Sequence, residues 1–428
     1  MEDLKTLIKN YEDSPDNSQR YQDLVTFCRG KLVDINCLSG EGSMIVRALA
    51  DSARSVTGRE VVVKSDIIRD VVKLNWDSEE TVIQVCRLGG NLCFDNPEGR
   101  TCILEAEVLD ELSNVVEEKL RNDTPSKLWF LVPSLLHNYC NENPGSLTSA
   151  KRLILITARH FQNVENKQEN IDQVENFVTF LSGLQQHEGK TDLFTEKNIV
   201  TSLVHILENF DFESSIVSVL DLLQELFEDE KICNEFVENR VVCAIMKRTE
   251  GLCVTESGEA VSEDVASQAL DLLALLSSHS SIVPKILTSE LDMSLSLWMT
   301  SPPSPHHLAT AALVAGNMAT SDSSVLQLLD TAIPGLLISH VSPGSPGKVL
   351  HAVIGCLRNL AVCLAARDKL SQLGLMETSC KLLVSLSSGT DHTVTPKLLS
   401  TIRLVTQVGT TTADIFEYYI VLKILGES

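Results

Sequence analysis

The sequence is poor in aromatic residues, in turn-forming residues and in long apolar runs. Aromatics make up 5% of the 428 residues, with 21 glycines and 13 prolines. A β-sandwich or barrel needs aromatic strands and many turns, so this composition disfavours both. No stretch approaches the roughly 18 uninterrupted apolar residues of a membrane-spanning helix. The first residues, Met1 to Lys5, lack the basic-then-apolar order of a signal peptide. We therefore expect a cytosolic protein with no direct membrane insertion.

Cations are also scarce. The chain has 35 Lys and Arg against 58 Asp and Glu, a net charge of −23. Nucleic acid is bound by neutralising phosphates with cations, so nucleic acid is excluded as a partner and basic partners are favoured. Apolar residues make up 43% of the chain, enough for a large buried core, and this excludes disorder.

Sequence signals for metal sites and catalysis are missing. The 12 cysteines are scattered without a Cys-x-x-Cys pair, whereas a zinc site needs clustered ligands. We interpret them as small buried hydrophobic residues in a reducing compartment. Gly40 to Ser43 lacks the Gly-Lys-Ser/Thr ending of a phosphate loop, and no nucleophile elbow is present. We predict no metal, no cofactor, no catalytic residue and no enzymatic activity.

A short pattern recurs through the chain: Asn, a larger side chain, then Ala or Cys. It is clearest at Asn359-Leu360-Ala361 and Asn317-Met318-Ala319, with further copies at Asn91 and Asn138. Including weaker copies, the Asn-equivalent positions, which we call markers, are 91, 138, 183, 225, 272, 317, 359 and 404. Their spacing of 42 to 47 residues is the period of armadillo or HEAT units.

The residues around each marker form the stripe of an amphipathic helix. Leu350, Val353, Leu357 and Leu360 follow helical spacing, beside a row of small residues that lets neighbouring helices approach closely. A turn and a second, short helical stretch follow each marker. We therefore predict an all-α fold, an α-solenoid of roughly nine armadillo-type repeats forming a right-handed superhelix with a concave groove. The array is expected to be one continuous domain over residues 1–428, best supported over 45–408.

Acidic residues are concentrated in the first part of the chain. Residues 1–265 carry a net charge of −21, whereas the remainder carries −2. Acids on the inner helices of a solenoid would attract a basic peptide, and Asp221 and Glu225 are candidates for such contacts. Glu228, Asp229 and Glu230 follow at the end of the same predicted helix. The alternative is that these acids lie on a solvated outer face.

The recurring asparagines have two possible roles. Asn91, Asn138, Asn317 and Asn359 could bond the backbone of the neighbouring repeat and brace the stack. They could equally project into the groove and bind the main chain of a partner, because an amide both donates and accepts hydrogen bonds. Arg358 is a candidate for binding a carboxylate or phosphate of a partner.

Several patches of the sequence carry a family resemblance. They run from Arg87 to Asp95 with Glu98-Gly99-Arg100, from Asn138 to Asn143, then through Leu297-Trp298, Asn317-Met318-Ala319 and Leu357 to Ala361. Together they resemble SmgGDS, the GDP-dissociation stimulator of small GTPases. These patches occur in the family's order over roughly residues 45–408. Several collinear patches are more specific than any one of them.

The resemblance implies a function. The family consists of armadillo-repeat proteins that bind Ras- and Rho-family GTPases through a basic, prenylated C-terminal tail and promote loss of GDP. We therefore expect a monomer whose acidic groove holds the tail while an apolar cleft shelters the lipid. Binding energy that favours the nucleotide-free GTPase would drive exchange without covalent chemistry. The family resemblance also allows association with the nucleus, endoplasmic reticulum or mitochondria.

Two other functions are compatible with this fold. A scaffold could bind basic peptides without exchange activity. The family continues for several units beyond Ser428, so the last unit, including the apolar stretch Ile415 to Leu425, is expected to be truncated, which favours this alternative. A nuclear-import receptor would place Trp four residues before each Asn. Arg87, Ser134, Leu313 and Gly355 occupy those positions here, which disfavours import.

Overall fold

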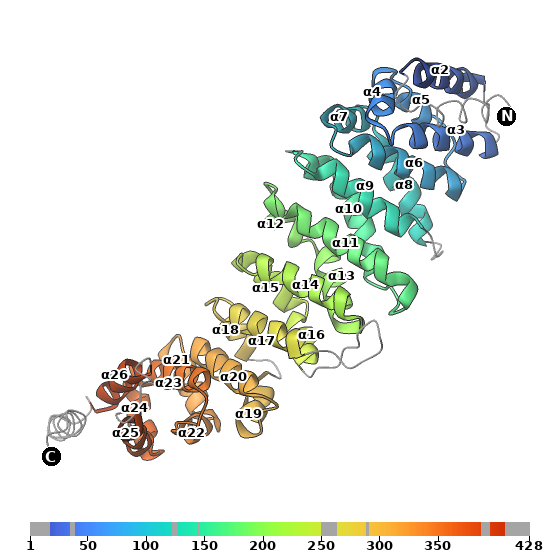
Figure 1. Cartoon of the computed structure of the whole chain (residues 1–428). Helices are drawn as coiled ribbons and strands as arrows, with labels where there is room; N and C mark the ends of the chain where they lie inside the picture. Colours follow the sequence, from blue (N-terminus) through green and yellow to red (C-terminus); the bar gives the residue numbers. More distant parts are fainter. Residues whose placement is uncertain are drawn as a thin grey trace. The chain divides into compact units, whose positions relative to one another are not determined.

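The computed structural model describes residues 18–34, 39–121, 127–143, 145–249, 263–287, 291–386 and 394–406. Within these ranges the secondary structure is helical and contains no β-strand (Figure 1). The chain divides into two compact units, which we call unit 1 (Met1–Leu222) and unit 2 (Leu223–Ser428). The all-α fold of armadillo-type repeats is confirmed. A single array over 1–428, with its superhelix and groove, stays a prediction, and Ile415 to Leu425 lies outside the described residues.

The helices of unit 1 begin with α2 (Ser18–Asp34), and α14 (Glu213–Leu226) continues past its last residue. Between these two the order is α3 (Ser39–Ser52), α4 (Val56–Lys64), α5 (Ile68–Val72), α6 (Glu79–Cys93), α7 (Pro97–Glu105), α8 (Val108–Arg121), α9 (Leu128–Cys140), α10 (Ser146–Phe161), α11 (Ile171–Gly183), α12 (Lys190–Phe194) and α13 (Lys197–Asn209). Two short 3₁₀ turns, η1 (Gln168–Asn170) and η2 (Leu184–Gln186), flank α11.

Unit 2 has the same alternation of long and short helices. Its elements are α15 (Glu230–Glu238), α16 (Val241–Thr249), α17 (Glu263–Ser277), α18 (Val283–Leu287), α19 (Leu291–Thr300), α20 (Pro305–Met318), α21 (Asp322–Leu329), α22 (Ile333–Ser339), α23 (Gly347–Val362), α24 (Leu364–Gln372), α25 (Leu375–Leu386) and α26 (Thr395–Thr406).

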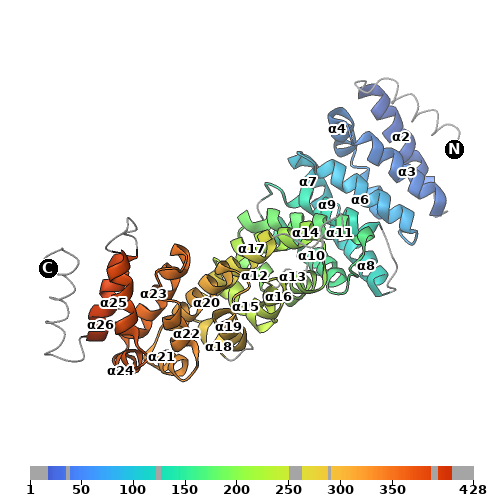
Figure 2. The ribbon, with the colours of Figure 1, turned by 60° about the horizontal axis from the view of Figure 1, so that its bottom comes forward.

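The helices that contain the marker positions stack side by side within each unit. In unit 1, α6 packs on α9 and α9 on α11, and α3, which contains no predicted marker, packs on α6 in the same way. In unit 2, α17, α20, α23 and α26 form a similar series (Figure 2). Gly316 explains one close approach, because a Cβ there would lie 3.2 Å from the Cα of Cys356 on the next marker helix. The row of small residues seen in the sequence therefore does serve helix packing.

Most marker helices are followed by two helices instead of the one that the sequence predicts, although α9 is followed by α10 alone. Where one short helix was expected, unit 1 has α7 and α8, and unit 2 has α24 and α25. A residue in the left-handed conformation separates the two helices: Glu107 (φ 57°) in the first case and Gly374 (φ 89°) in the second. Glycine signals such a turn in a sequence, but glutamate does not.

The short helix that follows a marker helix lies unusually close to it. A Cβ at Gly99, in the first turn of α7, would lie 1.9 Å from the carbonyl oxygen of Leu92 on α6. Gly58 on α4 has the same relation to α3, because its Cβ would lie 2.0 Å from the carbonyl oxygen of Ser52. Both positions therefore require glycine, and both fix how a marker helix connects to the next element.

Cysteines contribute mainly to the core. Cys28, Cys86, Cys93, Cys140, Cys233, Cys356 and Cys363 are buried as free thiols, which confirms the interpretation of these residues as small hydrophobic ones. Burial raises the pKa of Cys86 and Cys356 to about 12. Cys102 and Cys380 are partly exposed and Cys243 is exposed, so these three do not follow this interpretation, while Cys37 and Cys253 lie outside the described residues. In the part of the chain that the structure describes, no helix is long and apolar enough to cross a bilayer.

One buried histidine connects two helices of unit 1. The ring of His160 on α10 stacks on Trp129 of α9, with centroids 3.9 Å apart and planes 5° from parallel. Its Nε2 is buried and has no hydrogen-bond partner among the described residues. Burial lowers the pKa of His160 to about 4, so the neutral ring is the packed form.

His160 should make unit 1 less stable in acid. An unfolded histidine takes up its proton near pH 6.5, whereas folded His160 does so only near pH 4, so its contribution falls as the pH drops through this interval. The loss amounts to roughly 3 kcal/mol, at about 1.4 kcal/mol per pKa unit. We expect His160→Phe to remove this part of the pH dependence, measured by urea unfolding between pH 7 and about pH 4. Parallel stability curves for the two proteins would contradict this role.

Candidate partner-binding face

The marker asparagines connect successive marker helices. The Nδ2 of Asn91 donates to the carbonyl oxygen of Ala50 on α3 at 2.8 Å, and that of Asn138 donates to Gly90 on α6 at 3.0 Å. In unit 2, Asn317 donates to the carbonyl oxygen of Ala274 and Asn359 to that of Gly316, at 3.3 and 3.0 Å. Of the two roles left open by the sequence, bracing of the stack is the one these hydrogen bonds perform. Binding of a partner by the same side chains stays a prediction.

The hydrogen bonds also add one marker position and correct another. In the pairs Asn138–Gly90 and Asn359–Gly316, the accepting carbonyl lies one residue before the marker of the preceding repeat. By this rule Asp51 is the marker of α3, which the sequence reading did not include. On α17 the rule gives Leu275 instead of position 272, because Ala274 is the acceptor. Leu272 is 2% exposed and belongs to the core, which is why the earlier assignment was wrong.

Asn176 on α11 is a second inter-repeat amide that the sequence reading missed. Its Nδ2 lies 2.6 Å from the carbonyl oxygen of Phe130 and 2.7 Å from the Oγ of Ser134, both on α9. It lies two turns before the marker position 183, so the pattern around the marker could not reveal it. A search for Asn on the same helix face would have found it.

The predicted acidic residues Asp221 and Glu225 are both exposed on α14, one turn apart. Three marker helices in succession, α11, α14 and α17, contain acidic residues and no Lys or Arg. On α17, Asp264 and Asp271 are exposed. Such helices present a negative charge that no cation on the same helix reduces, and this favours a cationic partner.

Two of the acids that follow α14 have structural roles. Asp229 is the N-cap of α15, and its Oδ1 accepts the backbone N–H of Lys231 at 2.9 Å. Glu230 accepts the backbone N–H of Ser281 at 3.2 Å, and hydrogen bonding from Ser281 lowers the pKa of Glu230. Glu228 is exposed. Glu225 and Glu228 are thus better candidates for partner contacts than Asp229 or Glu230, and Asp221 stays a candidate because it is exposed one turn from Glu225.

Arg358 is exposed on α23, and its Nε donates to the Oγ of Ser400 on α26 at 3.2 Å. This bond fixes the inner end of the guanidinium group. No carboxylate among the described residues lies within ion-pair distance of it. The predicted role of binding an acidic group stays open to test.

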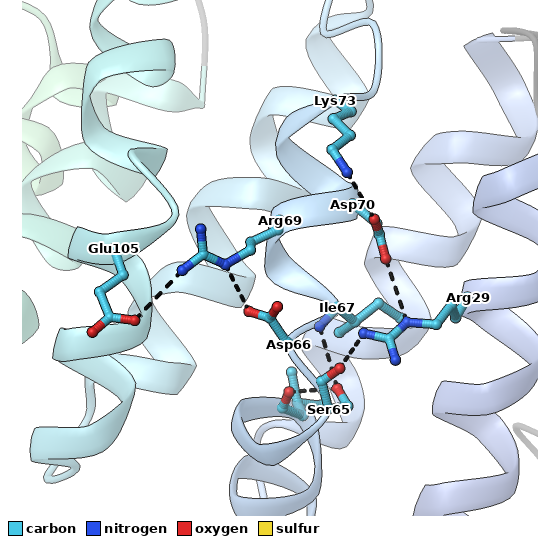
Figure 3. A network of polar contacts seen from close by, with 9 residues as sticks. Arg29, Ser65, Asp66, Ile67, Arg69, Asp70, Lys73 and Glu105 are labelled. Atoms are coloured by element: carbon cyan, nitrogen blue, oxygen red, sulfur yellow. Dashed lines mark hydrogen bonds and ion pairs between the residues drawn. The ribbon is translucent and has the colours of Figure 1, made fainter.

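Several cations of unit 1 are instead paired with carboxylates of the same unit. Arg87 contacts Asp51 at 2.6 Å, which connects α6 to α3. In Figure 3, Arg69 lies between Asp66 and Glu105, at 3.0 and 3.6 Å. The same figure shows Asp70 between Lys73 and Arg29, at 3.2 and 3.4 Å. These exposed pairs contribute little stability each, but they neutralise the cations locally.

The inter-repeat amide bond should have a measurable effect on stability. We expect Asn359→Ala to lower the free energy of unfolding of unit 2 by about 1–2 kcal/mol, because the carbonyl oxygen of Gly316 loses its donor. Urea unfolding with hydrogen exchange of α20 and α23 would measure the change. Asn163→Ala, at an exposed site, serves as the control and should change stability by less than about 0.5 kcal/mol. Equal stabilities of the two variants would indicate that Asn359 does not brace the stack.

Comparison with known proteins supports the likeness seen in the sequence. The chain is 25% identical over 396 residues to the Rap1 GTPase-GDP dissociation stimulator 1-B of Xenopus laevis, an alignment that covers 86% of this chain and 61% of the relative. It is 24% identical over 357 residues to the GTPase-GDP dissociation stimulator vimar of Drosophila melanogaster, covering 79% and 55% respectively. The chain is a distant homologue of these stimulators and spans about three fifths of their length. No model of a known protein family matches the chain.

One solved structure supports the fold. An engineered protein superimposes with a TM-score of 0.50 at 18% identity, covering 96% of this chain and 94% of the other. A designed armadillo repeat protein superimposes with a TM-score of 0.44 at 14% identity, covering 58% of this chain and 98% of that protein.

Proposed function

We propose that the chain binds small GTPases of the Ras and Rho families through their basic, prenylated C-terminal tails and stimulates the dissociation of GDP. The observation that carries this proposal is the collinear likeness to GTPase-GDP dissociation stimulators over 86% of the chain. The acidic marker helices, which contain no cations, provide independent support. We place this activity in the cytosol.

The proposed action needs no covalent chemistry. Asp221 and Glu225 attract the basic tail, and burial of the prenyl group adds affinity in proportion to the apolar area removed from water. GDP is released because the chain binds the nucleotide-free GTPase more tightly than the GDP-bound form. A ligand shifts an equilibrium only by its differential affinity for the two states, so this difference sets the degree of stimulation.

The test is the rate of release of fluorescent GDP from Rap-type and Rho-type GTPases, each in prenylated and unprenylated form, with the full chain added. Acceleration, greater for the prenylated form, supports the proposal. Binding without acceleration would support a scaffold that recognises basic tails. If the chain neither binds nor accelerates GDP release from any of the four GTPase preparations, the proposed function is overturned.

A further inference from the structure

Unit 2 presents a cationic surface that the acidic character of the chain does not predict. The marker helices α20, α23 and α26 contain no Asp or Glu. Five basic side chains lie on α23 and α26, and we call them the basic face. They are Lys348, His351 and Arg358 on α23, with Lys397 and Arg403 on α26. Four of these residues are exposed and Lys397 is partly exposed. With 58 acids against 35 cations in the whole chain, two packed helices that carry only cations stand out.

The basic face is a single surface, because side chains from the two helices touch. The Nζ of Lys397 lies 2.6 Å from the Nε2 of His351, and the Nε of Arg358 lies 3.2 Å from the Oγ of Ser400. Gly355 leaves room between these contacts, since a Cβ there would lie 4.0 Å from the Nζ of Lys397. His351, Gly355 and Arg358 are spaced three to four residues apart and therefore share one side of α23.

Three cations of this face have no carboxylate partner among the described residues. Lys348, Arg358 and Lys397 lie outside ion-pair distance of every carboxylate in the described ranges, whereas Lys369 and Lys381 of the same unit pair with Asp330 and Glu377. The Nε2 of His351, and not a carboxylate, lies within hydrogen-bond distance of the Lys397 Nζ. The Nε of Arg358 is occupied by Ser400, so its two terminal nitrogens remain as a planar fork that matches the two oxygens of a carboxylate.

We propose that the basic face binds an acidic segment on the body of the GTPase, through Asp or Glu side chains that reach Arg358 and Lys397. This inference rests on the proposed function and assigns the partner a second contact of opposite charge to its tail. Unit 2 by itself runs from exposed Asp264 and Asp271 on α17 to the cations of α23 and α26. Two contacts of opposite sign would fix the orientation of the partner, because the reversed orientation brings like charges together.

The experiment compares dissociation constants for one prenylated Rap-type GTPase. Arg358→Glu with Lys397→Glu is expected to weaken binding about tenfold at low ionic strength, and much less at about 1 M salt, where the Debye length is about 3 Å. Lys369→Glu with Lys381→Glu is the matched control, with the same change of net charge on α24 and α25 of unit 2, and should leave affinity within about twofold. The milder Arg358→Lys keeps the charge and loses the fork, so an intermediate loss is expected.

A second arm separates the body of the GTPase from its tail. The dissociation constants are measured again with a prenylated GTPase whose tail lysines are replaced by glutamine. Arg358→Glu with Lys397→Glu should weaken binding of this GTPase by the same factor as binding of the GTPase with the basic tail. Unchanged affinity on charge reversal, or a loss that vanishes with the neutral tail, would overturn the inference while leaving the proposed function in place. If the basic-face variant loses affinity for inorganic triphosphate but keeps its affinity for the GTPase, the face binds a phosphate group. This result would also overturn the inference. If the unaltered chain binds neither GTPase, the proposed function itself fails.

Discussion

Charge reversal on α14 is expected to abolish most of the electrostatic attraction for a basic GTPase tail. Asp221→Lys with Glu225→Lys replaces two attractive side chains with two repulsive ones on the exposed side of one helix. Exposed pairs contribute about 0.2–1 kcal/mol each, so the combined change should weaken tail binding by roughly tenfold or more at low ionic strength. Fluorescence anisotropy of a labelled basic, prenylated peptide would measure it.

Salt dependence and a matched variant define this prediction. At about 1 M salt the loss should shrink to a few-fold, because exposed charges are then screened within about 3 Å. Glu118→Lys with Glu188→Lys makes the same change of net charge at two exposed sites away from the marker helices and should have a small effect. If both double variants lose affinity equally, the net charge of the chain attracts the tail and α14 has no special role. An unchanged affinity at low salt would show that Asp221 and Glu225 face away from the tail.

Gly99→Ala is expected to have the largest effect on stability of any single change considered. The added Cβ would lie 1.9 Å from the carbonyl oxygen of Leu92 and 2.7 Å from its carbon, both backbone atoms of α6. Backbone atoms cannot rotate away, so α7 must move relative to α6, or the first turn of α7 must unfold. We expect a loss of at least about 3–4 kcal/mol in the free energy of unfolding of unit 1, in the range reserved for steric and backbone conflicts.

Gly335→Ala is the control for that prediction. Gly335 is also helical, on α22, but a Cβ there meets no atom within 4 Å. Alanine should therefore be neutral or slightly stabilising, by up to about 1 kcal/mol, since it restricts the unfolded chain. Circular dichroism during urea unfolding reports both variants. A Gly99→Ala protein as stable as the Gly335→Ala protein would contradict the close approach of α6 and α7.

Much of the repeat architecture could be predicted from local patterns. Asn91, Asn138, Asn317 and Asn359 recur because each one donates to a carbonyl of the preceding marker helix, so a structural requirement repeats with the period of the stack. Marker positions occupied by other residue types were harder to place. Leu272 was selected by its apolar neighbours, but apolar residues occupy both the core and the marker positions of α17.

Other features depend on contacts that no local pattern contains. Asp51 connects α3 to α6 through an ion pair with Arg87, which lies 36 residues further along the sequence. Glu107 adopts a left-handed conformation that glutamate does not signal, so the separation of α7 from α8 was missed. The basic face was only partly visible, since Arg358 was noted as a candidate but Lys397 reaches His351 across 46 residues of sequence.

The proposed mechanism depends on a difference in affinity between two states of the same GTPase. The most direct measurement is the dissociation constant of the chain for one prenylated Rap-type GTPase, determined once in nucleotide-free form and once with excess GDP. Stimulation of GDP release by binding energy requires tighter binding of the nucleotide-free form, by a factor of about ten for each 1.4 kcal/mol of coupling. Equal affinities for the two forms would contradict the mechanism, since such a ligand cannot displace the nucleotide equilibrium however tightly it binds.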